Sequence, residues 1–110
     1  MIPLWMFPLA LTTGNTFVLK PSELDPSATT VLAELGKDIF PPGTFNIIHG
    51  AKEAVDFVCD NPTIQAISFV GSNRVGEYIH ERGTRSGKRV QSNMAAKNHA
   101  AILPDAAKER

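Results

Sequence analysis

The sequence is 110 residues long, and 43% of the residues are apolar while 20% are charged. This size and composition suit one small globular domain, or part of one, and argue against a disordered chain. Eleven basic and eleven acidic side chains give a formal net charge of zero, so neither nucleic acid nor an anionic membrane surface is an expected partner.

The chain opens with a strongly apolar stretch, MIPLWMFPLAL. It is too short to span a bilayer, no basic region precedes it, and Pro3 and Pro8 interrupt it. We therefore predict a buried packing segment rather than a targeting signal. Gly14 and Asn15 then form a turn, and the β-branched and aromatic run at residues 16–19 predicts a first buried strand.

A helix is predicted next, with Asp25 as its N-cap and Pro26 in the first helical position. Its apolar side chains recur every three or four residues and define one face, formed by Ala28, Val31, Leu32, Leu35 and Ile39. The Pro-Pro-Gly sequence at residues 41–43 ends this helix, and residues 45–48 predict a second strand.

A short helix is predicted at residues 52–60, with an inward face made by Val55, Val58 and Cys59. The apolar run at residues 64–70 predicts the third and clearest strand. The following helix begins after Gly71 and Ser72, contains Val75, Tyr78 and Ile79, and is bounded by Gly83 and Gly87. Residues 89–91 and 100–103 predict two further short strands.

Strands that alternate with helices at this spacing predict βαβ units. The expected fold class is therefore α/β, with an open parallel sheet, flanking helices and right-handed crossovers. In such sheets ligands bind outside the carboxyl ends of the strands, so residues that directly follow a strand are the candidates for a binding site.

Two candidate sites fall at predicted strand ends. Lys20 and Glu23 follow the first strand, and an ammonium and a carboxylate at this spacing can both hydrogen-bond the vicinal hydroxyls of a ribose. An ordinary surface charge pair is the alternative. Gly71 and Ser72 follow the third strand and open a helix whose free N–H groups suit a pyrophosphate, the alternative being a plain turn with a serine cap. The common Gly-x-Gly-x-x-Gly dinucleotide fingerprint is missing.

Other reactive side chains favour structural roles. Cys59, the single cysteine, lies on an apolar helix face with nothing electropositive nearby, which favours core packing over catalysis. The histidines fall on separate elements without metal-ligand spacing, so no metal site is predicted at His49, His80 or His99. A basic cluster is interpreted as a solvated helix end, formed by Arg82, Arg85, Lys88 and Arg89.

Five segments follow one another in a recognisable order: PLWMFPLAL, GNTFVLKPSE, PPGTFNIIHG, ISFVGS and KRVQSNMAAKNHA. They resemble successive segments of the coenzyme domain of the aldehyde dehydrogenase superfamily, and the resemblance covers nearly the whole chain. The short segments IIHG, FVGSN, GEYI and AKNH resemble the methylmalonate-semialdehyde dehydrogenase branch in particular. That branch oxidises malonate or methylmalonate semialdehyde with NAD and passes the acyl group to coenzyme A. The resemblance thus implies a Rossmann-like NAD-binding domain, present only in part over residues 1–110.

The resemblance also implies roles for individual residues. Lys20 and Glu23 match the positions that hold the adenosine ribose, and Gly71 and Ser72 match the turn at the pyrophosphate. The remaining implied cofactor-binding residues are Phe69, Val75 and Met94.

One further position separates branches of the superfamily. Asn93 replaces the glutamate that activates water in hydrolytic members, and an amide cannot act as a general base near neutral pH. Release of the acyl group by the thiol of coenzyme A is therefore expected. Ala95 stands where the family usually has glycine.

The implied covalent chemistry lies outside these residues. The oxyanion asparagine is expected before Met1 and the cysteine nucleophile after Arg110, so no catalytic residue is assigned and the chain alone is expected to be inactive. Catalytic and oligomerisation domains are expected to be absent. The full enzyme is expected to be a homo-oligomer, mitochondrial in a eukaryote or cytoplasmic in a bacterium. A non-catalytic NAD-binding fragment or pseudogene-like product, and a piece of a hydrolytic aldehyde dehydrogenase, remain as alternatives.

Overall fold

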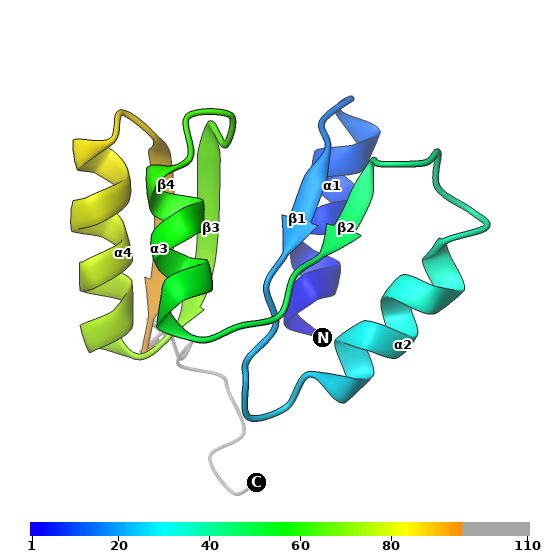
Figure 1. Cartoon of the computed structure of the whole chain (residues 1–110), viewed down its shortest axis with the longest axis horizontal. Coiled ribbons are helices and arrows are strands. Elements are labelled where there is room, and N and C mark those ends of the chain that lie inside the picture. The colour runs from blue at the N-terminus through cyan, green and yellow to red at the C-terminus, as the bar shows by residue number, and fades with distance from the viewer. Residues whose placement is uncertain (96–110) are drawn as a thin grey trace, which may run out of the picture.

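The computed structural model of the chain describes residues 1–95 (Figure 1). Its strands form two parallel two-stranded sheets. In one sheet β1 (Phe17–Leu19) pairs with β2 (Phe45–Ile47), and in the other β3 (Ala66–Gly71) pairs with β4 (Arg89–Met94). The predicted α/β class, with parallel open sheets and flanking helices, is confirmed.

Each connection between successive strands contains a helix. These helices are α2 (Ser27–Gly36), α3 (Lys52–Asp60) and α4 (Asn73–Arg85), and the 3-10 helix η1 (Ile2–Trp5) and α1 (Phe7–Thr12) precede β1. All four strands point the same way, so their carboxyl ends lie along one side of the molecule (Figure 1). We call this side the carboxyl edge and define it by the residues that end or follow the strands: Lys20, Gly50, Gly71 and Ala95.

The predicted strands are present, with ends that differ by a few residues. Strands predicted at residues 16–19, 45–48 and 64–70 correspond to β1, β2 and β3. The strand predicted at residues 89–91 extends to Met94, while the strand predicted at residues 100–103 lies outside the described residues. Within residues 1–95 no helix is both long enough and apolar enough to cross a membrane.

The prediction for α2 was wrong at both ends. Asp25 is not the N-cap: Pro26 takes that position, no side chain caps the helix, and the helix begins at Ser27. The helix ends at Gly36, well before the Pro-Pro-Gly sequence, where the N–H of Lys37 bonds three residues back, to the carbonyl of Glu34. The backbone carbonyl of Gly36 accepts hydrogen bonds from the N–H groups of Ile39 and Phe40. These bonds close a turn that lays the ring of Phe40 against Gly36.

The apolar face predicted for α2 was also wrong in part. Val31, Leu35 and Ile39 are 53%, 68% and 74% exposed. Leu32 is partly covered, and the fully buried position is Gly36, where Phe40 packs closely. The helix therefore turns a narrower face toward β2 than the spacing of apolar residues predicts.

The N-terminal segment is buried at one residue rather than throughout. Phe7 is 6% exposed and packs into a cluster of phenylalanine rings, whereas Trp5 and Leu9 are 56% and 69% exposed. The ring centroid of Phe7 lies 4.8 Å from that of Phe45 and 5.9 Å from that of Phe40. This aromatic cluster is the core of the β1–β2 half, and Cys59 and Ile79 are the most buried apolar side chains of the β3–β4 half.

Candidate functional site

Lys20 and Glu23 form an ion pair at the carboxyl end of β1. Lys20 Nζ lies 3.3 Å from Glu23 Oε2, and it also donates to the carbonyl oxygens of Pro21 at 2.6 Å and Gly50 at 2.8 Å. The lysine thereby ties the end of β1 to the loop between β2 and α3. Its side chain is 18% exposed, whereas that of Glu23 is 56% exposed, so the carboxylate is the more accessible member of the pair.

The Glu23 carboxyl is held in its ionised form. A hydrogen bond from its own backbone N–H, followed by the hydrogen bond and charge of Lys20, holds the pKa of Glu23 below its usual value. An exposed carboxylate of this kind can accept hydrogen bonds from the hydroxyls of a ligand.

Gly71 and Ser72 lie where β3 passes into α4. Gly71 is the last residue of β3, and Ser72 is the N-cap of α4 with extended backbone angles. The Ser72 side chain makes no capping hydrogen bond, so the predicted serine cap is present by position only. Its exposed hydroxyl and the first-turn N–H groups of a thirteen-residue helix form a set of donors suited to an anion.

The ring of Phe69 crowds the end of β3 and favours glycine there. A Cβ atom on Gly71 would lie 2.5 Å from Cζ of the Phe69 ring, which is closer than real contacts allow. The ring is half-buried beneath the turn. Val75, in the first turn of α4, is 40% exposed on the same part of the edge.

The carboxyl end of β4 lies beside this turn. The register pairs Val70 with Asn93 and Gly71 with Met94, and the backbone N–H of Ala95 donates to the carbonyl of Gly71 over 3.1 Å. Asn93 is exposed, whereas Met94 is half-buried. The fold thus brings Gly71, Ser72 and Met94 together. Lys20 and Glu23 follow β1, whose carboxyl end points to the same side of the molecule (Figure 1).

Cys59 is confirmed as a packing residue. Its side chain is 0% exposed, and burial raises the pKa of the thiol above its usual value. A buried, protonated thiol is a poor nucleophile. His49 is exposed in the loop after β2, His80 is exposed on α4, and His99 lies outside the described residues. In the described part of the chain, no three His, Cys, Asp or Glu side chains gather in a way that could hold a metal ion.

The interpretation of the basic cluster as a solvated helix end was wrong for Lys88. This lysine is 6% exposed, and its ammonium donates to the backbone carbonyls of Asn61 and Ile64. It therefore closes the turn after α3 from inside the fold. Arg85 does fit the interpretation, since it is 74% exposed and, within residues 1–95, forms an ion pair only with its helix neighbour Glu81.

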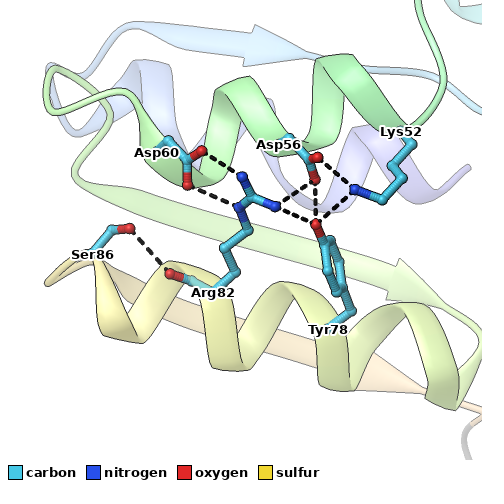
Figure 2. Close-up of polar contacts among 6 residues, drawn as sticks. All are labelled: Lys52, Asp56, Asp60, Tyr78, Arg82 and Ser86. Atoms are coloured by element: carbon cyan, nitrogen blue, oxygen red, sulfur yellow. Dashed lines mark hydrogen bonds and ion pairs between the residues drawn. The ribbon is translucent and has the colours of Figure 1, made fainter.

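Sequence reasoning also missed a polar network that joins α3 to α4 (Figure 2). Arg82 donates to both carboxylate oxygens of Asp60, at 2.9 Å and 2.6 Å. The Tyr78 hydroxyl donates to Asp56 and accepts hydrogen bonds from Lys52 and Arg82. The available signal was spacing: Lys52, Asp56 and Asp60 recur every four residues, as do Tyr78 and Arg82.

The network also shifts the ionisation of its members. Hydrogen bonds from Lys52 and then Tyr78 hold the pKa of Asp56 below its usual value. The hydrogen bonds of Arg82 have the same effect on the pKa of Asp60. Both carboxylates therefore stay charged and hold the two helices together.

Concave surface is found away from the carboxyl edge. Two shallow hollows, of about 170 and 180 Å³, flank Phe40 and Pro41 at the opposite ends of β1 and β2. Neither is lined by a residue of the ion pair or of the Gly71–Ser72 turn.

A parallel α/β fold with polar groups gathered at the carboxyl ends of its strands is the architecture of nucleotide-binding domains. Over residues 1–110 the chain matches the aldehyde dehydrogenase family. The chain belongs to that family.

Within this family, the chain is similar to methylmalonate-semialdehyde dehydrogenases. The rat mitochondrial acylating methylmalonate-semialdehyde/malonate-semialdehyde dehydrogenase is 66% identical over 110 residues, which are 99% of this chain and 21% of the relative. The crystal structure of methylmalonate-semialdehyde dehydrogenase from Oceanimonas doudoroffii has a TM-score of 0.85 and 49% identity, covering 90% of this chain and 20% of that one.

A third relative was solved with a nucleotide. A protein from Sinorhizobium meliloti 1021, described by the same enzyme name and complexed with NAD, has a TM-score of 0.86 and 48% identity. The match covers 96% of this chain and 22% of that one. The chain thus spans about a fifth of the length of the relatives it matches.

Proposed function

We propose that this chain forms part of the NAD-binding domain of an NAD-dependent, CoA-acylating dehydrogenase of methylmalonate or malonate semialdehyde. One observation carries the proposal: the Lys20–Glu23 pair and the Gly71–Ser72 turn follow strands that end on the same edge. The high identity to acylating relatives, and the NAD complex of one of them, support the choice of cofactor and branch.

The adenosine ribose of NAD fits the Lys20–Glu23 pair. The exposed Glu23 carboxylate would accept hydrogen bonds from ribose hydroxyls, and a hydroxyl oxygen would replace the longest of the three contacts of Lys20, the 3.3 Å contact with Glu23. The same carboxylate repels a 2′-phosphate, which favours NAD over NADP.

The pyrophosphate fits the turn between β3 and α4. The hydroxyl of Ser72 and the N–H groups of the first turn of α4 would donate to it, and Gly71 keeps the backbone open to a close approach. Phe69 and Val75 would flank the bound nucleotide, and Met94 would lie beside the part of it beyond the pyrophosphate.

Asn93 supports acyl transfer to coenzyme A over hydrolysis. Its amide is exposed at the end of β4, and it cannot take a proton from water near neutral pH. When bound, NAD supplies the hydride acceptor. In the full enzyme a semialdehyde is the substrate, coenzyme A is the co-substrate, and a homo-oligomer is the expected assembly. A mitochondrial location is proposed for a eukaryotic source, because the eukaryotic relatives are mitochondrial.

Cys59 favours a second candidate for the chain by itself, a non-catalytic NAD-binding segment. The only cysteine of the chain is fully buried, so no thiolate is available to form a thioester with an aldehyde. The purified chain is therefore expected to produce no NADH from methylmalonate semialdehyde, NAD and coenzyme A. NADH production above the rate without protein would refute this.

Titration calorimetry with NAD tests the proposed site. Binding should be lost when Lys20→Ala and Glu23→Ala are combined. It should persist in the control that combines Lys37→Ala with Asp38→Ala, because both residues are exposed and lie beyond α2. Equal loss of binding in both double variants, or no binding by the parent chain, would refute the proposed NAD site. The similarity to the dehydrogenases would then reflect common ancestry alone.

A further inference from the structure

Helix α4 rests on β3 and β4 through two buried glycines. A Cβ atom on Gly83 would lie 2.7 Å from Cγ2 of Val90 and 3.2 Å from Cδ1 of Ile67. A Cβ atom on Gly76 would lie 2.5 Å from Sδ of Met94 and 3.3 Å from Cε1 of Phe69. Because these glycines lack side chains, the helix backbone approaches both ends of β4 closely.

The end of β4 near Gly76 is held by three separate contacts. The side chain of Met94 packs on the bare surface of Gly76, and the hydroxyl of Ser92 donates to the Gly76 carbonyl over 3.2 Å. The N–H of Ala95 donates to the Gly71 carbonyl on β3. The last residues of β4 are thus fixed to α4 and to β3 at once.

These contacts determine what the end of β4 presents to the carboxyl edge. Burial alternates along the strand, so Ser92 and Met94 face α4 whereas Asn93 is exposed on the opposite face of the sheet. Ala95 then turns the chain with a φ of 26°, a left-handed conformation that residues with a Cβ rarely adopt. Such a conformation persists only where the surrounding structure holds it.

We propose that Gly76 and Met94 are positioning residues, whose contact sets residues 93–95 against the Gly71–Ser72 turn. Residues 93–95 would then already be in position beside the part of a dinucleotide that extends beyond the pyrophosphate. Met94 acts through its packing on α4, and Gly76 acts by leaving room for it. This inference rests on the proposed NAD site, and it identifies the packing contact that positions the residues beyond the pyrophosphate turn.

Amide hydrogen exchange at Ala95 in the full chain tests the contact without any ligand. Met94→Ala removes the contact without creating a clash, and it should raise the exchange rate of the Ala95 amide at least tenfold. Gly76→Ala should do the same, because its Cβ displaces Met94. Combining the two changes should bring the rate back toward that of the parent chain, since the new Cβ fills the vacated space.

The contact at the other end of β4 supplies matched controls. Gly83→Ala and Val90→Ala make the same changes where α4 meets the start of the strand, and they should leave Ala95 exchange within threefold of the parent chain. Equal acceleration by the Gly83 and Gly76 variants would overturn the proposal. An unchanged rate in Met94→Ala would do so as well.

Nucleotide affinity distinguishes positioning from general packing. Gly76→Ala, at a buried position that touches no nucleotide, should weaken NAD binding at least fivefold while AMP binding stays within twofold, because AMP ends before the segment at residues 93–95. An equal loss for both nucleotides would overturn the positioning role. If the parent chain bound neither nucleotide, the proposed NAD site would fail, while exchange at Ala95 would still decide whether the contact holds the end of β4.

Discussion

Replacing Phe7 by leucine should destabilise the chain by about 2 kcal/mol. Phe7 is 6% exposed, and its ring lies within 6.4 Å, between centroids, of those of Phe17, Phe40 and Phe45. A buried apolar swap of similar volume costs up to about 1.5 kcal/mol, and loss of an aromatic pair costs about 0.5–1.5 kcal/mol more. A domain of this size has a free energy of unfolding on the order of 5–15 kcal/mol, so the loss is a large share of it.

Urea unfolding followed by circular dichroism measures this loss, and thermal unfolding should show a decrease in Tm of roughly 10 °C. Leu9→Ala is the matched control, because Leu9 belongs to the same helix but is 69% exposed. Its effect should stay within about 0.5 kcal/mol. Equal effects of the two substitutions would refute the assignment of the aromatic cluster as the core of the β1–β2 half.

Three further predictions concern charge, the thiol and association. Since Lys52 and Tyr78 lower the pKa of Asp56, its carboxylate stabilises the fold above the ordinary value of 3.8, and this contribution is lost as the pH falls below it. Between about pH 5 and about pH 3 the Tm of the parent chain should fall more steeply than that of Asp56→Asn; parallel curves would contradict this. The buried Cys59 thiol should react with a maleimide in urea but not in buffer, and rapid labelling in buffer would show it to be accessible. Strand edges that are unpaired within residues 1–95, and exposed apolar residues such as Trp5, predict association that grows with concentration in light scattering; scattering that stays at the monomer value at every concentration would contradict this.

The sequence predicted the strands and their alternation with helices because those signals are local. Apolar runs of four to seven residues bounded by turn residues stand out in a single chain, and β3 is the clearest case. Once strands alternate with helices the sheet is parallel, and its carboxyl ends share one edge. Lys20 and Gly71 could therefore be assigned to the same edge from their positions alone.

The orientation of α2 and the burial of Lys88 could not be predicted in this way. The apolar positions of α2 are spaced for a wider buried face than β2 covers. The spacing therefore predicts an apolar helix face but not which of its residues are buried. Lys88 is buried because two carbonyl oxygens accept its hydrogen bonds, and those belong to residues 24 and 27 positions away. Neither partner is visible from the charge pattern around Lys88.

Gly76 is an example of a residue whose packing role could not be predicted from the sequence. A glycine inside a helix costs roughly 1 kcal/mol relative to alanine, so its presence signals a compensating contact. The sequence shows that cost but not the contact, because Met94 lies eighteen residues further along and reaches Gly76 only when β4 pairs with β3. The sequence alone therefore places the residues proposed to touch a nucleotide at strand ends, whereas the packing that sets the distances between them becomes visible only in the folded chain.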